Sequence, residues 1–570
     1  MRQKTSSDRF IVLLAIPTFL VITFFVVLPM VLTAVESAGG DGLSTNYGDF
    51  LDGATQQALL LSVGISLLSV LFAGLIGTAL AVLLNRFDFP GRRWLEVFAV
   101  LPLALPPLIG TIAFVLLFST SGIIPRALGQ LGIAPSSVAF NGVAGVLLVH
   151  AFTQYPYFYM AVSSGLASLD PSIEEAAASL GAPRWKMWRD VLLPMLTPSL
   201  VAGALITFMT AMASFTAPQL YNVQTLTLQI VATRTSGDYS LAAAQSTVLG
   251  VVSIIFLFVM RWYQGRRVHR SLSKGVQSHR AQAKGAAALL AAVGSTLLSL
   301  VLLAPIVVIF LVSFSVDGTW TTQILPDQFT VQNYLDIFSQ PDLFLPVNVS
   351  LQTSLIATLA AVVVGGAAAW VIARWPFRGK SLMDMAIMLP WALPGTVIGV
   401  NLVTAFAAPT PWNLGLVLVG SIVILPVAYF VRYVPLVFRN ASASIEQLDP
   451  SVNEAAQSLG ASPVRALVTV VLPLVAKGLI AGALLAFVDG VGEYVASVIV
   501  YPAGFAPMSV AIYQMIYGSQ FGTAAAYGSL QILLIFVVLV VSSRLQAGRR
   551  SRRGGLTPVD PAPVAAGGAA

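Results

Sequence analysis

Two acidic residues in a strongly apolar stretch are the first candidates for chemistry in this sequence. Asp489 and Glu493 stand four residues apart in "AFVDGVGEYVASV", so a helix would place both carboxylates on one face. Carboxylates in a membrane-like setting are costly, and they usually face a water-filled cavity where they attract cations. The pair fits a cation-attracting vestibule or gate, or a solvated helix end packed against outer loops, and the solvated helix end is the favoured interpretation.

Aromatic and histidine side chains form the second group of candidates. Tyr155 and Tyr157 follow His150 in another apolar stretch, and we expect them to serve packing or an interface, with both tyrosines also candidates for a substrate path. The spacing of His150, His269 and His279 does not predict a metal-ligand cluster. The sequence contains no cysteine, which removes thiol catalysis, disulfides and Cys-ligated zinc or iron–sulfur sites. We therefore expect the chain to hold no metal or cofactor of its own.

A polar segment that occurs twice forms the third group. Residues 169–182 read "LDPSIEEAAASLGA" and residues 448–461 read "LDPSVNEAAQSLGA", with eleven of fourteen positions identical. In each copy the Asp or the Ser can cap a helix, Pro suits the first turn, Ser and Glu form a capping box, and Gly ends the helix. Each copy predicts a short amphipathic helix, which needs a packing partner to persist in water. A single copy would suit a loop helix resting on its own bundle, whereas two near-identical copies favour docking to a duplicated partner.

The composition indicates that membrane-spanning helices carry these groups. Hydrophobic residues make up 57% of the 570 residues, charged residues 9%, and the mean hydropathy is +0.86. Soluble domains carry about 25% charged residues. Unbroken apolar runs predict helices and not the short alternating strands of a membrane β-barrel. The chain is therefore expected to be an all-α polytopic membrane protein, with about twelve spans near these residues: 11–34, 58–84, 95–119, 143–165, 191–215, 241–262, 286–313, 349–373, 381–407, 415–438, 470–495 and 524–545.

The positions of the basic residues predict the orientation of these spans. Lys and Arg cluster in the even-numbered connections, between the halves and near the carboxyl end, whereas the predicted outer loops hold only Arg126 and Arg234. Because basic loops stay in the cytoplasm, both termini are expected inside. The net charge of +7 is then a topology signal with some lipid-headgroup contact, and it requires no nucleic acid. Residues 546–570, rich in Gly, Pro and Ala, are expected to be a disordered cytoplasmic tail.

Matched motifs divide the chain into two modules. Asp170 and Asp449 lie 279 residues apart, and the other shared residues of the repeated polar segment keep that spacing. We expect one six-span module at 1–265 and a second at 285–545, joined by a basic cytoplasmic linker at 266–284. Because each module has an even number of spans, both face the same way, as parallel repeats about an axis along the membrane normal. Such symmetry suits a path between the halves.

Prolines interrupt the third and ninth predicted spans at matching positions. Pro102 and Pro106 correspond to Pro390 and Pro394, 288 residues later. The difference from the spacing of the polar segments places nine additional first-half residues between the two motifs, most simply in the outer loop 119–141. The prolines predict kinks, which serve either a gate or only helix packing.

The repeated segments resemble the signature of the permease subunits of bacterial type I ABC importers. In both copies Glu-Ala-Ala is followed after three residues by Gly, and Leu-Pro stands about a dozen positions further on. The resemblance covers nearly the whole chain and implies the permease fold of that family, in which this segment is a coupling helix held in a cleft of the ATP-binding subunit. The copies differ where Asn453 replaces Glu174, which leaves open whether the two docking sites are equivalent.

The resemblance assigns coupling helices to about 170–182 and 449–461. It implies contact with the ATPase for these residues: Asp170, Glu175, Ala176, Ala177, Gly181, Asp449, Glu454, Ala455, Ala456 and Gly460.

The resemblance also implies a function and partners. A permease of this kind forms a translocation path by alternating access, is driven by two copies of a separate ATPase that uses ATP and Mg, and receives its solute from an extracytoplasmic binding protein at the bacterial inner membrane. No G-x-x-x-x-G-K-[ST] phosphate loop occurs in this sequence, so we expect no enzymatic activity from this chain. Within the family the chain is most similar to ferric-iron permeases, with thiamine, phosphonate, polyamine or another small solute as alternatives.

Membrane proteins of other classes make different demands on the sequence. An ion-gradient-driven secondary transporter predicts buried charges mid-span in both halves, yet the first half has Thr210 and Ser214 where the second has its two acids. Such a transporter also gives no reason for duplicated polar cytoplasmic helices. A membrane enzyme would need clustered His, Asp or Glu near an interface, and nothing in the sequence resembles a channel filter. The permease hypothesis is therefore favoured.

Bulky or charge-reversing substitutions in the repeated segments are expected to abolish transport. The variants are Gly181→Trp, Gly460→Trp, and the pair Glu175→Lys with Glu454→Lys, each of which changes a surface that a partner must contact. Uptake by cells is measured beside the amount of protein in the membrane fraction, which should not fall. Normal uptake in all of these variants would contradict the docking role.

Overall fold

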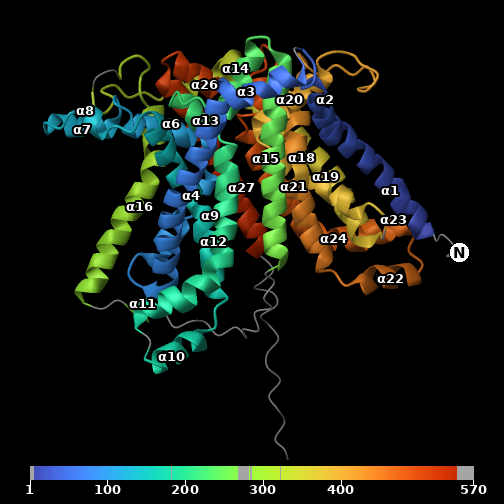
Figure 1. Cartoon of the computed structure of the whole chain (residues 1–570), viewed down its shortest axis with the longest axis horizontal. Coiled ribbons are helices and arrows are strands. Elements are labelled where there is room, and N and C mark those ends of the chain that lie inside the picture. The colour runs from blue at the N-terminus through green and yellow to red at the C-terminus, as the bar shows by residue number, and fades with distance from the viewer. Residues whose placement is uncertain are drawn as a thin grey trace, which may run out of the picture.

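The fold is a bundle of long helices that run side by side, with short helices gathered at its two ends (Figure 1). The computed structural model describes residues 6–40, 42–181, 183–266, 281–282, 285–320, 323–375 and 377–547. Within these ranges one two-stranded parallel sheet occurs, in which β1 (Phe87–Asp88) pairs with β2 (Ala281–Gln282). The expectation of an all-α chain is confirmed.

In the described residues of the first half there are fifteen α-helices, two short π-helical segments and one 3₁₀ segment. They are α1 (Ser6–Ile22), the π segment η1 (Thr23–Val27), α2 (Leu28–Glu36), α3 (Leu43–Asp52), α4 (Ala54–Arg86), α5 (Arg92–Phe98), the 3₁₀ segment η2 (Leu101–Ala104), α6 (Pro107–Phe118), α7 (Ile123–Gln130), α8 (Pro135–Val138), α9 (Gly142–Ala167), α10 (Pro171–Ser179), α11 (Arg184–Lys186), the π segment η3 (Met187–Leu192), α12 (Leu193–Met212), α13 (Thr216–Leu220), α14 (Leu226–Thr235) and α15 (Tyr239–Arg266).

The second half repeats the main helices of the first. They are α16 (Ala286–Ser313), α17 (Gln332–Ser339), α18 (Pro341–Arg374), α19 (Lys380–Ala392), α20 (Gly395–Phe406), α21 (Ile424–Glu446), α22 (Pro450–Ser458), α23 (Pro463–Ala466), the π segment η4 (Leu467–Val471), α24 (Leu472–Val491), α25 (Ser497–Val500), α26 (Met508–Tyr517) and α27 (Phe521–Ala547). In the first half α4, α9 and α12 pack on one another, and in the second half α18, α21 and α24 do the same.

The long helices account for the predicted spans. In the described residues nine helices are long and apolar enough to cross a membrane, or ten if the bent pair α19–α20 is one span. Two others, α9 with 26 residues and α21 with 23, are long enough to cross but carry more polar side chains. The predicted start of the tenth span at residue 415 is wrong, because α21 begins at Ile424. Gly415 and Gly420 have φ of +75° and +86°, which breaks the apolar run into a loop.

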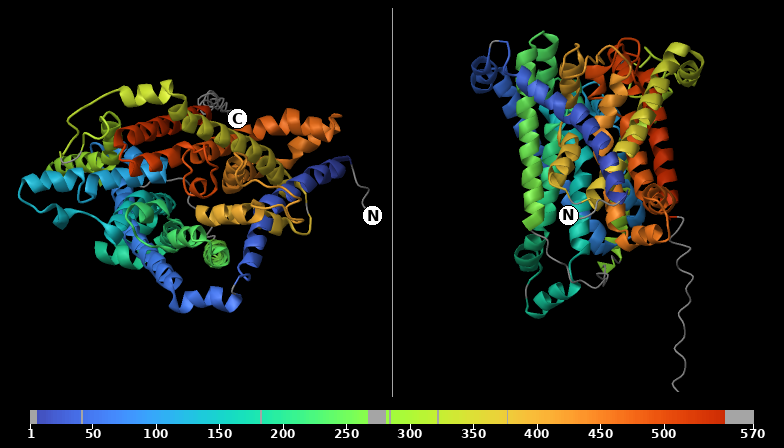
Figure 2. Two further views of the ribbon diagram at one scale, coloured as in Figure 1. Left: turned by 90° about the horizontal axis from the view of Figure 1, so that it is seen from above. Right: turned by 90° about the vertical axis from the view of Figure 1, so that its right-hand side faces the viewer.

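The first helix of each half packs on the other half. Helix α1 lies against α18, α19 and α23, and α2 lies against α20, although both precede the first module's core in sequence. Helix α16, at the start of the second half, lies against α5 and α6. There the hydroxyl of Ser295 donates to Pro90 O at 3.3 Å. The two halves are thus joined by an exchange of helices as well as by a shared face (Figure 2).

Prolines break the third and ninth predicted spans, as expected. Pro102 lies in η2, Pro106 immediately precedes α6, and Pro390 and Pro394 flank the junction of α19 and α20, which meet at 112°. Proline lacks an amide N–H and disfavours helical backbone at the preceding residue, which accounts for the extended backbone of Leu105 before Pro106 and of Leu393 before Pro394. The kinks are therefore confirmed, while a gating role for these residues stays a prediction.

Matched glycines let helices approach closely in each half. A Cβ at Gly77 in α4 would lie 2.7 Å from Phe158 Cβ and 2.9 Å from Tyr159 N in α9. At Gly365 in α18, the equivalent position, it would lie 3.2 Å from Phe438 N in α21. Small residues are the usual means by which membrane helices pack tightly. The first half leaves less room than the second.

The substitution Gly77→Ala is expected to destabilise the protein more than Gly365→Ala does. Its methyl group meets backbone that cannot move aside, and overpacking of this kind costs about 1–3 kcal/mol. Gly64→Ala, in the same helix α4 with no atom within 4 Å of the new Cβ, is the matched control. Thermal unfolding of the purified protein in detergent measures the effect. Equal midpoints for the variants at 77 and 64 would contradict the packing argument.

Candidate functional site

The two repeated segments form short helices at one end of the bundle. Helices α10 and α22 lie at the lower end in Figure 1, while α3, α13, α14 and α26 gather at the opposite end. Helix α1 contacts α23 beside α22, so the beginning of the described chain lies near this end as well. Each of the two helices has nine residues, as the repeated pattern predicts.

Aspartate caps both short helices. Asp170 Oδ1 accepts a hydrogen bond from Ser172 N, and Asp449 Oδ1 accepts one from Ser451 N, each at 2.9 Å. The Ser172 backbone amide and hydroxyl hold the pKa of Asp170 below its usual range, so the cap stays ionised at neutral pH. The predicted capping box is wrong in α22, because Asp449 is the N-cap and Ser451 lies inside the helix. An ionised carboxylate also suits the positive end of a helix.

Left-handed glycines end both helices beside an exposed leucine. Gly181 and Gly460 have φ of +77° and +89°, a region that residues with a Cβ rarely adopt. The preceding residues, Leu180 and Leu459, are 88% and 90% exposed. A Cβ at either glycine would meet no atom within 4 Å, so the surface around each turn is open. Each turn presents an apolar side chain that nothing in the described chain covers.

The other predicted contact residues lie on the same short helices. Glu454 and Ala455 are exposed in α22, while Ala456 and Ala177 are half-buried. The side chains of Glu175 and Ala176 lie outside the described residues.

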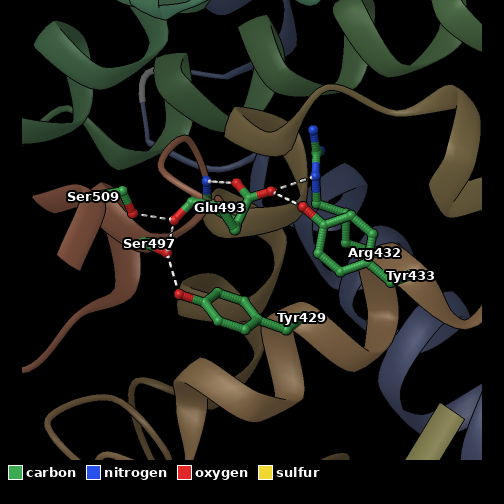
Figure 3. A network of polar contacts seen from close by, with 7 residues as sticks. Tyr429, Arg432, Tyr433, Glu493, Ser497 and Ser509 are labelled. Carbon is green, nitrogen blue, oxygen red and sulfur yellow. Dashed lines mark hydrogen bonds and ion pairs between the residues drawn. The ribbon is translucent and has the colours of Figure 1, made fainter. Parts of the chain in front are cut away.

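Glu493, one of the two acidic candidates, is a buried structural residue. It is 4% exposed, and its Oε2 lies 2.7 Å from Arg432 Nε in α21, at ion-pair distance without hydrogen-bond alignment (Figure 3). Tyr433 donates to the same oxygen, and Ala496 N donates to Oε1 at 2.8 Å. The expectation that Glu493 belongs to the substrate path is wrong, because every side of its carboxylate is occupied by the protein.

The Glu493 backbone extends this network. Its carbonyl oxygen accepts from the hydroxyls of Ser497 at 2.8 Å and Ser509 at 2.6 Å, and Ser497 is 2.7 Å from the Tyr429 hydroxyl (Figure 3). The network ties α21 to the ends of α24, α25 and α26.

Asp489 differs from Glu493 although it stands only one turn away in α24. Its side chain is exposed, and within the described chain it forms no hydrogen bond or ion pair. It acts electrostatically on Arg432 of its own half and on Tyr157 in α9 of the other half. Asp489 thus lies at the boundary between the halves. In the part of the chain that the structure describes, no three His, Cys, Asp or Glu residues group as metal ligands.

The two predicted tyrosines separate in the structure. Tyr155 is 1% exposed and belongs to the core between α4 and α9, so its assignment to the substrate path is wrong and the packing interpretation holds. Tyr157 is half-buried within reach of the Asp489 charge and remains a candidate.

The first half has an uncharged counterpart of the Arg432–Glu493 pair. Ser214 occupies the position equivalent to Glu493, and His150 occupies that of Tyr429, both at a spacing of 279 residues. His150 Nε2 is 2.9 Å from Ser214 Oγ, and its Nδ1 is 2.8 Å from Ser69 Oγ. The histidine joins α4, α9 and the end of α12. Sequence reasoning recognised neither His150 nor Arg432 as a residue that joins helices through polar contacts.

A glutamine and two tyrosines connect the halves near this level. Gln219 in α13 accepts from the Tyr494 hydroxyl at 2.7 Å and donates to the Tyr513 hydroxyl at 2.9 Å. These are contacts between first-half and second-half residues that lie 275 and 294 positions apart.

Comparison with known proteins identifies similar chains. Residues 73–271 and 361–551 each match the family described as binding-protein-dependent transport system inner membrane component. The chain is 28% identical to the probable ABC transporter permease protein y4fN of Sinorhizobium fredii, over 87% of this chain and 88% of that protein. It is 26% identical to the ferric transport system permease protein FbpB of Actinobacillus pleuropneumoniae, over 94% and 78%. It is 30% identical to the sulfate transport system permease protein CysT of Salmonella typhimurium, over 39% and 84%.

Removal of one member of the buried ion pair is expected to destabilise the protein strongly. Glu493→Gln or Arg432→Met leaves an uncompensated charge, which costs about 3–5 kcal/mol. The double variant should be more stable than the sum of the single effects, because it buries no lone charge. Asp489→Asn, in the last turn of α24 just before Glu493 and without an ion-pair partner in the described chain, is the control. Thermal unfolding in detergent measures all four, and additive losses in the double variant would contradict a coupled pair.

Proposed function

The chain belongs to the family of binding-protein-dependent transport system inner membrane components, the permease subunits of ABC importers, and we propose that it carries ferric iron inward when separate ATPase subunits drive it. It is a multi-pass inner-membrane protein with the family's domain present twice. The translocation path would lie between the two halves and open alternately to each side. An extracytoplasmic binding protein would deliver the iron.

The duplicated short helices are the observation that supports ATPase coupling. Helices α10 and α22 share a cap, a left-handed glycine and a leucine that is about nine-tenths exposed. Isolated exposed leucines are common on proteins, but two at equivalent turns on one end of the bundle fit a duplicated partner. The proposal assigns one ATPase copy to each helix, with ATP and Mg bound by those subunits and no cofactor in this chain.

The charge between the halves supports a cationic substrate. Arg432 and Glu493 neutralise each other as an ion pair, which leaves Asp489 as the acidic side chain of this group that no ion pair occupies. A net negative group attracts cations and repels oxyanions such as sulfate. Among the relatives, the ferric permease of Actinobacillus pleuropneumoniae matches over nearly the whole chain, whereas the sulfate permease matches over 39% of it. Ferric iron therefore fits better than sulfate.

The predicted outer loops strengthen the argument for a cation. They hold only two basic residues, Arg126 and Arg234, and a larger set of acidic ones: Glu36, Asp41, Asp49, Asp52, Asp238, Asp317, Asp327, Asp336 and Asp342. An acidic entrance raises the local concentration of cations. This assignment places both termini and the coupling helices in the cytoplasm, as the distribution of basic residues predicts.

A reconstituted system tests the proposed function. The protein is placed in proteoliposomes with its genomically adjacent ATPase and binding protein, and uptake of radioactive Fe(III) is followed with and without ATP. ATP-dependent iron uptake is the expected result. Parallel assays offer sulfate, molybdate, thiamine and a polyamine. Uptake driven by an ion gradient without ATP would overturn the ABC mechanism, and uptake of sulfate in place of iron would overturn the cation assignment alone.

The Asp489 side chain is expected to affect the substrate and not the fold. Asp489→Asn removes the free charge and should lower the iron uptake rate about tenfold, while Asp489→Glu should restore part of it. Thr210→Val, at the equivalent neutral position of the first half, is the matched control. Unchanged uptake kinetics in Asp489→Asn would remove this residue from the path.

A further inference from the structure

The first coupling helix is tied to a transmembrane helix by an ion pair. Arg86, the last residue of α4, donates from Nη1 to Oε2 of Glu174 in α10 at 2.5 Å and from Nη2 to Oε1 at 2.7 Å. The two side chains are only 21% and 24% exposed. Bidentate pairing of this kind fixes orientation as well as distance, which sets it apart from an ordinary surface pair.

The same arginine also stacks on a tryptophan. The Arg86 guanidinium carbon lies 5.1 Å from the ring centre of Trp188, which stands in η3 directly before α12. A cation over an indole face adds attraction and orients the guanidinium. Arg86 therefore joins the end of α4, the first coupling helix and the start of α12.

The second half lacks both partners of this cluster. Arg374 ends α18 as Arg86 ends α4, but Asn453 stands at the position of the carboxylate and Leu467 at the position of the indole. Neither residue can form an ion pair or a cation–π contact. Within the described residues no ion pair joins the second coupling helix to α18, and the Arg374 charge acts on Asp449, the N-cap of α22, only electrostatically.

Arg374 makes weaker contacts in place of the missing ones. Its Nη2 donates to Leu448 O at 3.4 Å, its guanidinium lies over Trp370 of its own helix, and its buried Nε has no hydrogen-bond partner in the described chain. Leu448 precedes α22 and is not part of it, so the hydrogen bond holds the connection to the coupling helix and not the helix itself.

A second basic residue near each of these arginines is buried in the first half and exposed in the second. In the first half Arg92 is 7% exposed, donates to Leu84 O at 2.8 Å and pairs with Glu96. The equivalent residue of the second half, Lys380, is exposed and lines a pocket of about 770 Å³ between the ends of α18, α19 and α21. A buried arginine of the first half thus corresponds to an exposed lysine beside a pocket in the second half.

We infer that the two coupling helices are mechanically inequivalent, because the Arg86–Glu174 pair locks the first to α4 while the second can shift relative to α18. Movement of an ATPase against α10 then passes directly to α4 and to α9 and α12, which pack on it. Movement against α22 passes through packing on α23 and η4. Arg86 and Glu174 are positioning residues for energy coupling, an assignment that rests on the proposed function.

The stoichiometry of transport tests this inference. In proteoliposomes with the ATPase and binding protein, the ratio of Fe(III) imported to ATP hydrolysed is expected to fall about fivefold in Arg86→Ala and Glu174→Gln. Exchange of the two charges, in Arg86→Glu with Glu174→Arg, should restore the ratio. Arg374→Ala is the matched control in the second half and should leave it unchanged. Equal losses in Arg86→Ala and Arg374→Ala, or none in either, would overturn the inference.

A distance measurement on the permease alone, without ATPase or binding protein, tests whether the Arg86–Glu174 pair fixes α10 to α4. Because the chain has no cysteine, spin labels can be placed at Phe87→Cys with Ser179→Cys, and in a separate protein at the equivalent Trp375→Cys with Ser458→Cys. Pulsed electron resonance of the permease alone should give a narrower distance distribution for the first pair than for the second. Arg86→Ala should widen the first distribution, and Arg374→Ala should change neither. Equal widths in the unsubstituted protein would overturn the inference.

The two measurements separate this inference from the proposed function. The substitutions at Gly181 and Gly460 can abolish uptake while Arg86→Ala changes neither the transport ratio nor the distance distribution. In that case the short helices do couple to the ATPase, but the Arg86–Glu174 pair does not fix the first of them to α4. If the first spin-label pair gives the narrower distance distribution but no ATP-dependent uptake is found, the Arg86–Glu174 pair does fix α10 to α4 and the proposed function is wrong.

Discussion

Polar groups inside the hydrocarbon layer must find partners within the chain, and this requirement organises the protein. It makes the spans helical, since only a helix satisfies its own backbone there. Where prolines interrupt a span, another helix covers the break, as Gly492 of the second half does against Pro106 of the first. Where a charge enters, as at Glu493, the protein surrounds it with Arg432, a tyrosine hydroxyl and a backbone amide. Asp489 stands apart because it forms no hydrogen bond or ion pair in the described chain, and it is therefore the residue that we propose for the substrate path.

The two halves share one arrangement of helices but differ in where they use ion pairs and where they use neutral hydrogen bonds. The junction of α9 with α12 is held by His150 between two serine hydroxyls, while the equivalent junction of α21 with α24 is held by an ion pair. At the end of the bundle where α10 and α22 lie the division is reversed, because in the described residues the first half has an ion pair there and the second half has none. The second half thus has its ion pair at the end of α24, and the first half has its ion pair on the short helix α10.

Structural features that depend on nearby residues, or whose sequence occurs twice, could be predicted from the sequence. The spans follow from hydropathy, the short helices α10 and α22 from capping and glycine signals, and the kinks from Pro102, Pro106, Pro390 and Pro394, because each depends on neighbours in the chain. Sequence reasoning failed at residue 415, where an apolar run is bent by two glycines with positive φ. It also failed for Glu493 and Tyr155, whose burial depends on helices far away in sequence. The pairing of Arg86 with Glu174 joins residues 88 positions apart, which no periodicity encodes.

The exchange of first helices between the halves has a consequence for biosynthesis. Helix α2 ends at Glu36, whereas α18, on which α1 packs, begins only at Pro341, 305 residues later. At about 5–20 residues per second, the ribosome needs roughly 15–60 s to supply that surface. During this interval the leading helix must wait in the bilayer without its native neighbour, held by lipid or by the insertion machinery. Synthesis of the first module therefore does not complete its assembly, because α1 can pack on its native neighbours only after the second half has been synthesised.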